Sequence, residues 1–109
     1  CEYWIRSHLY DLRSETKNQQ LVDEIADNWK SSSLSEVQTA MCLFAEKLTL
    51  QPGTISKLDI ETLSDYALSD KEISEIVQIV SYFNYINRVA DGLGLEPEEF
   101  IDKKGYKIN

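Results

Sequence analysis

The sequence predicts an all-α protein, and three observations favour this fold class. Apolar residues recur at three- and four-residue spacing along most of the chain, which is the period of an amphipathic helix. Serines before these segments are followed three residues later by Gln or Glu, the pattern of a helix capping box. No segment pair alternates apolar and polar residues as a strand hairpin does. We therefore expect one domain of about five helices over residues 1–109.

The first two helices are predicted from stripes of large apolar residues. The first helix should carry one stripe at three- and four-residue spacing, formed by Trp4, Ile5, His8, Leu9 and Leu12. The second helix should span residues 19–29, with a stripe of Leu21, Val22, Ile25 and Trp29, before a linker of three serines at 31–33. Because the helical pattern already includes the first residues, we expect the sequence to be the C-terminal part of a longer chain.

Capping signals and helix breakers delimit the next three helices. Ser35 and Gln38 form a capping box before a helix with an apolar face of Ala40, Met41, Phe44, Ala45 and Leu48, and Pro52 with Gly53 should end it. Ser56 should cap a shorter helix that holds Leu58, Ile60 and Leu63. Ser69 and Glu72 form another capping box, which opens the longest helix, to about residue 91, with Ile73, Ile76, Val77, Val80, Phe83 and Ala90 along one stripe.

The C-terminal segment has no helical stripe. From Asp102 onward it mixes lysines with Gly105, so we expect it to be frayed unless Tyr106 and Ile108 dock on a neighbouring element. The broad apolar stripes exceed what a small domain can bury, and the aromatic residues of the first helix are of the kind favoured at interfaces. We therefore expect a homo-oligomer.

The composition and charge of the chain argue against several classes of function. The net charge of −8 repels phosphate backbones and anionic membrane surfaces, so neither nucleic acid nor a membrane is expected as a partner. The sequence shows neither a span of about 20 apolar residues nor a signal-peptide pattern. We expect a cytoplasmic protein whose two cysteines are reduced. One His and two distant Cys do not make a zinc site, and no cofactor motif is present.

The residues with the most chemistry lie at the start of the chain. Cys1 and His8 are seven residues apart, which is two turns along one helix face, with Trp4 between them. A helical side chain leans toward the N-terminus, so His8 should lean over Trp4. In the first turn of a helix, the free backbone amides favour the thiolate form of Cys1. Without the redox chemistry, both residues would be ordinary side chains on a helix face.

Several segments together resemble a known superfamily. Cys1, Tyr3 and His8 are followed by Leu12 and Arg13, and then by the segments LVDEIADNW, LSEVQTAMCLFAEKLT and LSDKEISEIVQIVSYFNYINRVADGLG. This order resembles the alkylhydroperoxidase D-like (AhpD-like), carboxymuconolactone decarboxylase superfamily, in its peroxidase-related branch. The resemblance implies an all-helical oligomer. Redox-active members carry a Glu and a Cys-x-x-Cys-x-x-x-His motif, in which Cys1 falls on the first cysteine, Trp4 on the second and His8 on the histidine.

The resemblance implies an oxidoreductase with an antioxidant role, namely thiol-dependent reduction of a small-molecule hydroperoxide by Cys1. His8 would assist proton transfer, an external thiol would regenerate Cys1, and activity would be weak or lost because Trp4 is not a cysteine. The alternatives are a helical oligomer without catalysis, or a carboxymuconolactone decarboxylase-like enzyme by kinship alone. If Cys1 is the true N-terminus, its amino group could also act as a base for its thiol.

Two asparagines and the second cysteine complete the candidate residues. Asn84 and Asn87 lie on the longest helix, each four residues before a charged residue, so we expect them to organise helix packing, with lining of the binding site as the alternative. Cys42 lies at the flank of an apolar stripe, where a free cysteine behaves as a small apolar residue. Its alternative is a resolving thiol within disulfide reach of Cys1.

Overall fold

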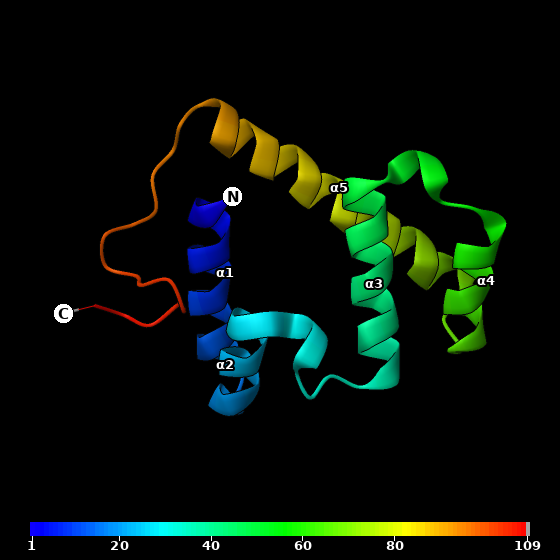
Figure 1. Ribbon diagram of the computed structural model, residues 1–109, viewed down its shortest axis with the longest axis horizontal. Helices are drawn as coiled ribbons and strands as arrows, with labels where there is room; N and C mark the ends of the chain where they lie inside the picture. The colour runs from blue at the N-terminus through cyan, green and yellow to red at the C-terminus, as the bar shows by residue number, and fades with distance from the viewer. Residues whose placement is uncertain (109) are drawn as a thin grey trace. The chain divides into compact units, whose positions relative to one another are not determined.

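The computed structural model describes residues 1–108, and they form an all-α protein (Figure 1). The helices in chain order are α1 (Glu2–Glu15), α2 (Gln19–Asn28), α3 (Glu36–Leu50), α4 (Lys57–Asp65) and α5 (Asp70–Gly92). Short 3-10 turns follow α2 at Trp29–Ser31 and α3 at Pro52–Thr54. Over these 108 residues there is no strand, only an isolated antiparallel bridge between Ile101 and Lys107. The predicted fold class and the number of helices are confirmed.

The chain separates into two compact units, which we describe in turn. The first unit comprises residues 1–34 and 87–108, and the second comprises residues 35–86. The helix α5 contributes its last turns to the first unit and the rest of its length to the second. That residues 1–109 form one AhpD-like domain stays a prediction.

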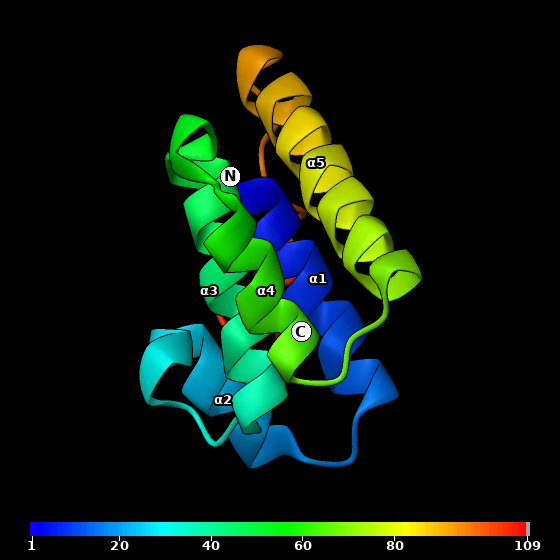
Figure 2. The same ribbon diagram turned by 90° about the vertical axis from the view of Figure 1, so that its right-hand side faces the viewer.

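The second unit is built around an apolar core. Phe44 of α3, Leu63 of α4 and Ile73 of α5 are buried together, and α3 and α4 are in contact (Figures 1 and 2). Partly buried apolar residues surround this cluster: Ala40, Leu48, Ile55, Ile60, Leu68, Ile76 and Val77. Burial of large apolar side chains contributes about 1.5 to 3 kcal/mol each, so this cluster stabilises the second unit.

The predicted caps start the helices of this unit. Ser35 accepts a hydrogen bond from the Gln38 amide while Gln38 accepts one from the Ser35 amide, as a capping box requires. Ser69 and Glu72 do the same before α5. The chain between α4 and α5 turns at Ala67, whose φ of +63° lies in the left-handed region. This position is strained, because a Cβ atom crowds the backbone there.

The buried apolar residues of the first unit come from four different segments. Its buried apolar residues are Leu9 of α1, Val22 of α2, Ala90 at the end of α5 and Ile101 in the C-terminal segment. The stripe predicted on α1 is buried only in part: Leu9 is buried, whereas Ile5 and Leu12 are 55% and 38% exposed and His8 is also exposed. The face of α1 that packs carries Arg6, Leu9 and Arg13 instead.

The C-terminal segment, which lies beside α1 in Figure 1, is ordered by a turn. The Asp102 side chain accepts hydrogen bonds from the amides of Lys104 and Tyr106, and the Ile108 amide donates to the Phe100 carbonyl. We call residues 100–108 the C-terminal hairpin. Of the two predicted states of this segment, the docked one is found for Tyr106, whose hydroxyl contacts α2.

Gly105 allows the C-terminal hairpin to approach α1 closely. Its φ is +83°, and a Cβ atom built on it would lie 2.5 Å from the carbonyl carbon of Leu9. Only glycine tolerates both the backbone conformation and this contact. Of the helices described, none is long and apolar enough to cross a membrane.

Candidate functional site

Cys1 stands at the start of α1. It is the N-cap residue of this helix, and its carbonyl accepts a hydrogen bond from the Ile5 amide at 3.1 Å. Its side chain makes no capping hydrogen bond and is partly exposed, with a free thiol. The amides of the first helical turn therefore remain available to stabilise a negative charge at the sulfur.

Trp4 and His8 are in direct contact on the next two turns of α1. Their rings stack with centroids 5.2 Å apart and an angle of 21° between the planes, and Tyr3 packs edge-on against Trp4 at 5.0 Å. The imidazole thus leans toward the N-terminus over Trp4, as the spacing predicted. Position 4, which lies between Cys1 and His8 along the helix, thus holds an indole that stacks on the imidazole.

The two candidate asparagines have different surroundings. The Oδ1 atom of Asn84 accepts a hydrogen bond from the Thr49 hydroxyl at 3.0 Å, which ties α5 to α3 within the second unit. This contact supports the structural role expected for Asn84. The Oδ1 atom of Asn87 belongs to the first unit and is buried with no hydrogen-bond partner within residues 1–108, as is the indole nitrogen of Trp4. Among the described residues, the first unit therefore contains one buried acceptor, Asn87 Oδ1, and one buried donor, Trp4 Nε1, without hydrogen-bond partners.

The candidate residues are thus divided between the two units. Cys1, Trp4, His8 and Asn87 belong to the first unit, and Asn84 belongs to the second. Cys42 also lies in the second unit, on α3, where burial raises the pKa of its thiol. A raised pKa disfavours the reactive thiolate, which supports the interpretation of Cys42 as a small apolar residue.

A polar cluster around Arg13 was missed by the sequence analysis. The Arg13 guanidinium donates to the Lys104 carbonyl at 2.8 Å, to the Asp23 carboxylate at 2.6 Å and to the Gln19 side chain at 3.2 Å. It also lies 3.7 Å from the centre of the Tyr106 ring. Although charged, the Arg13 side chain is only 7% exposed. Arg13 therefore joins α1, α2 and the C-terminal hairpin.

The ionisable groups around Arg13 stabilise one another. The Tyr106 hydroxyl donates to Asp23 at 2.8 Å, and this hydrogen bond, together with Arg13, lowers the pKa of the Asp23 carboxyl. The same hydrogen bond raises the pKa of Tyr106. Asp27 pairs with Lys104 at 3.0 Å and raises the pKa of that amine. The one sequence signal for this cluster was the Asp102 to Gly105 turn, which predicts a reversal of the chain but not its partner.

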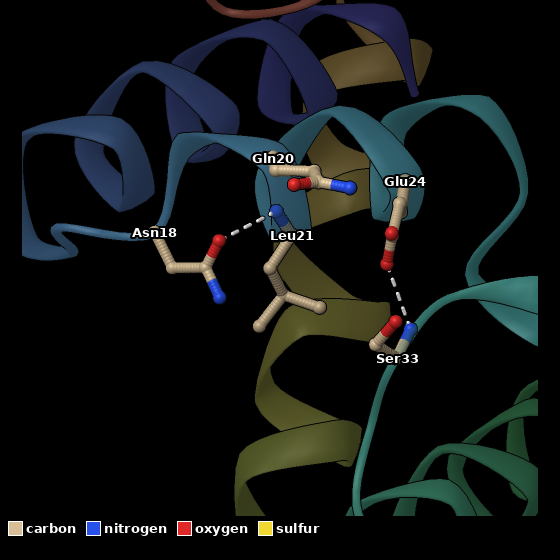
Figure 3. A pocket seen from close by; sticks show the side chains of 5 residues that line it. All are labelled: Asn18, Gln20, Leu21, Glu24 and Ser33. Atoms are coloured by element: carbon tan, nitrogen blue, oxygen red, sulfur yellow. Dashed lines mark hydrogen bonds between the residues drawn. The ribbon is translucent and has the colours of Figure 1, made fainter.

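A shallow pocket of about 150 Å³ lies at the N-terminal end of α2 (Figure 3). The Asn18 side chain at its edge accepts a hydrogen bond from the Leu21 amide, and Glu24 accepts one from the Ser33 amide. Both side chains thus already accept hydrogen bonds from backbone amides, and they offer little to a ligand. This pocket is separate in sequence from Cys1, Trp4 and His8.

Within residues 1–108, no group of three or more His, Cys, Asp or Glu residues is arranged to hold a metal ion. Neither a scan against models of protein families nor a search of curated proteins found a match to this chain.

Proposed function

We propose that this chain is an AhpD-like, peroxidase-related protein in which Cys1 is the redox thiol and Trp4 limits its activity. The observation that carries the proposal is the row of Cys1, Trp4 and His8 on α1, with the Trp4 and His8 rings stacked. This row reproduces the spacing of the motif that the sequence resembles, with a tryptophan at the second cysteine position. The implied activity is reduction of a hydroperoxide at Cys1.

The chemistry would follow the one-cysteine route. The Cys1 thiolate attacks the terminal oxygen of a hydroperoxide, the O–O bond breaks, and an alcohol leaves while Cys1 becomes a sulfenic acid. The leaving alkoxide takes a proton, which His8 can supply directly or through water. Two equivalents of an external thiol then reduce the sulfenic acid, with loss of water and formation of a disulfide between the external thiols. No metal or organic cofactor is needed for this cycle.

Trp4 explains why turnover should be slow. In the motif, a cysteine at position 4 would lie one helical turn from Cys1 and would condense with its sulfenic acid. An indole has no sulfur and offers only an N–H donor, so it cannot perform this step. Cys1 must then wait for an external thiol, and prolonged exposure to peroxide should overoxidise it to sulfinic acid.

Differential labelling of the two cysteines tests the proposal. Cys1 should react with iodoacetamide faster than Cys42 near neutral pH, because burial raises the pKa of the Cys42 thiol. His8→Ala should slow the labelling of Cys1 but not of Cys42. The protein should be used in its longest natural form, so that no artificial amine lies beside Cys1. Equal labelling rates for the two thiols, unchanged by His8→Ala, would refute an activated Cys1.

A helical oligomer without catalysis is the second candidate, and the exposed side of α5 favours it. Ile79, Tyr82 and Tyr85 of this helix are 57%, 58% and 64% exposed, and no charged residue lies between positions 76 and 87. Exposed apolar stripes of this kind are typical of interfaces. Under this alternative, light scattering gives a mass above one chain, Tyr82→Glu lowers that mass, and Cys1→Ser changes nothing measurable.

A further inference from the structure

The C-terminal hairpin is attached to α1 and α2 by polar contacts, by the buried Ile101 side chain and by the Phe100 ring, which packs edge-on against Tyr10 of α1. Arg6 donates to the Ile101 carbonyl at 3.3 Å and Arg13 donates to the Lys104 carbonyl, while Lys104 pairs with Asp27. Ile101 is the buried apolar side chain of the hairpin, at 1% exposure. The attachment thus combines several local contacts, which open together when the hairpin leaves α1.

The helix α1 packs against α2 and against the C-terminal hairpin. Leu9 is its buried apolar residue, and the hairpin at Gly105 lies directly against the backbone of Leu9 and Tyr10. Arg6, Leu9 and Arg13 lie on one face of α1, at three- and four-residue spacing. Cys1, Trp4 and His8 lie on another face of the same helix. The hairpin therefore holds α1 without covering the candidate redox residues.

We propose that the C-terminal hairpin is a latch on α1, which closes around Arg13 and whose opening loosens the helix that begins at Cys1. In the closed state, Arg13 joins Asp23, Gln19 and the Lys104 carbonyl, and the Tyr106 ring covers its guanidinium. In the open state, Arg13 keeps its partners on α2, while Leu9 becomes exposed and α1 frays. Hairpin and helix thus open as one cooperative unit.

The hydroxyl of Tyr106 is the point at which this latch is sensitive to charge. The Tyr106 hydroxyl donates a hydrogen bond to Asp23 of α2, Arg13 of α1 lies over the Tyr106 ring, and Lys104 is a charged neighbour in the hairpin. A negative charge added at the Tyr106 oxygen would lie beside the Asp23 carboxylate and would oppose closure. The proposal does not depend on Cys1 being reactive, so its failure and that of the proposed function are distinguishable.

Amide hydrogen exchange in two glycine variants tests the latch. Gly105→Ala should prevent closure, because its Cβ atom would meet the Leu9 backbone at 2.5 Å. Gly94→Ala is the matched control, since Gly94 also has a positive φ, of +63°, but a Cβ atom there meets nothing within 4 Å. We expect exchange in both α1 and the hairpin to accelerate about tenfold or more in Gly105→Ala. In Gly94→Ala, α1 should exchange as in the parent.

A milder variant keeps the test informative even if Gly105→Ala unfolds the whole first unit. Tyr106→Phe removes only the hydrogen bond to Asp23 and should accelerate exchange in the hairpin and α1 together, by about two- to tenfold. The latch is refuted if the hairpin of Gly105→Ala exchanges faster while α1 stays protected. It is refuted equally if the two glycine variants affect α1 to the same extent.

Discussion

The two units of this protein differ in the interactions that stabilise each of them internally. In the second unit, Phe44, Leu63 and Ile73 form an apolar core from three helices. In the first unit, a nearly buried Arg13 joins two helices and the C-terminal hairpin through hydrogen bonds and an aromatic ring. The difference shows that local periodicity predicts the first kind of cohesion but not the second, which depends on residues distant in sequence.

The largest expected effect is loss of the apolar core in the second unit. Phe44→Ala should lower the free energy of unfolding by about 3 to 5 kcal/mol, because it removes a ring that is only 6% exposed and leaves a cavity. Its neighbour on α3, Leu43, is 50% exposed, so Leu43→Ala should cost less than about 1 kcal/mol. Urea denaturation of both variants measures this contrast, and similar losses in the two would contradict the described core.

Removing Arg13 should have the next largest effect, in the first unit. Arg13→Ala leaves Asp23 and the Lys104 carbonyl without their shared donor and should cost about 2 to 3 kcal/mol in urea denaturation. Arg13→Lys keeps the charge but not the planar fork, so it should restore less than half of the loss. Full rescue by lysine would mean that charge alone, rather than the three-way hydrogen bonding, holds this unit.

Relief of backbone strain should give a smaller, stabilising effect. Ala67→Gly removes the cost of a positive φ between α4 and α5 and should raise the free energy of unfolding by about 0.5 to 1 kcal/mol. Ala26→Gly within α2 is the opposite control, and it should destabilise by about 1 kcal/mol because its backbone is helical. A loss of stability in Ala67→Gly would show that this turn is not strained in solution.

The smallest expected effect is a loss of stability of the first unit at alkaline pH. The pKa of Tyr106 is raised because its hydroxyl donates to Asp23, so the protonated phenol favours the folded form. This contribution is fully present below the unfolded pKa of about 10.0 and is lost as pH rises through the higher folded value. Exchange in the C-terminal hairpin should therefore accelerate above that pH beyond the intrinsic rate. Tyr106→Phe should abolish the additional acceleration.

Much of the fold could be predicted from the sequence, because its signals are local. The serine caps at 35 and 69 fixed the starts of α3 and α5, and the glycine at 94 adopts the left-handed conformation expected after a helix. The sequence pattern did not indicate which face of α1 packs. There the apolar Ile5 and Leu12 are exposed, whereas Arg13 packs through its long side chain.

The remaining features could not be predicted, because they join distant residues. Arg13 and Lys104 are 91 positions apart, and Asp23 and Tyr106 are 83 apart, so no helical period relates them. For the candidate site, the spacing of Cys1, Trp4 and His8 correctly predicted that the imidazole leans over the indole. The environments of Asn84 and Asn87 depend on partners in other elements, which a single sequence does not reveal.

The most direct test of the proposed motif is to supply the missing thiol. Trp4→Cys, in a Cys42→Ser background, places two thiols one turn apart on α1, close enough for a disulfide after modest adjustment. Trp4→Ser is the matched control, since it also removes the indole but adds no sulfur. After peroxide treatment, mass spectrometry of folded Trp4→Cys protein should show an intramolecular disulfide to Cys1, with faster peroxide turnover than in Trp4→Ser. A folded variant with no such disulfide and no gain in turnover would contradict the proposal that Cys1 and His8 form a redox motif interrupted by Trp4.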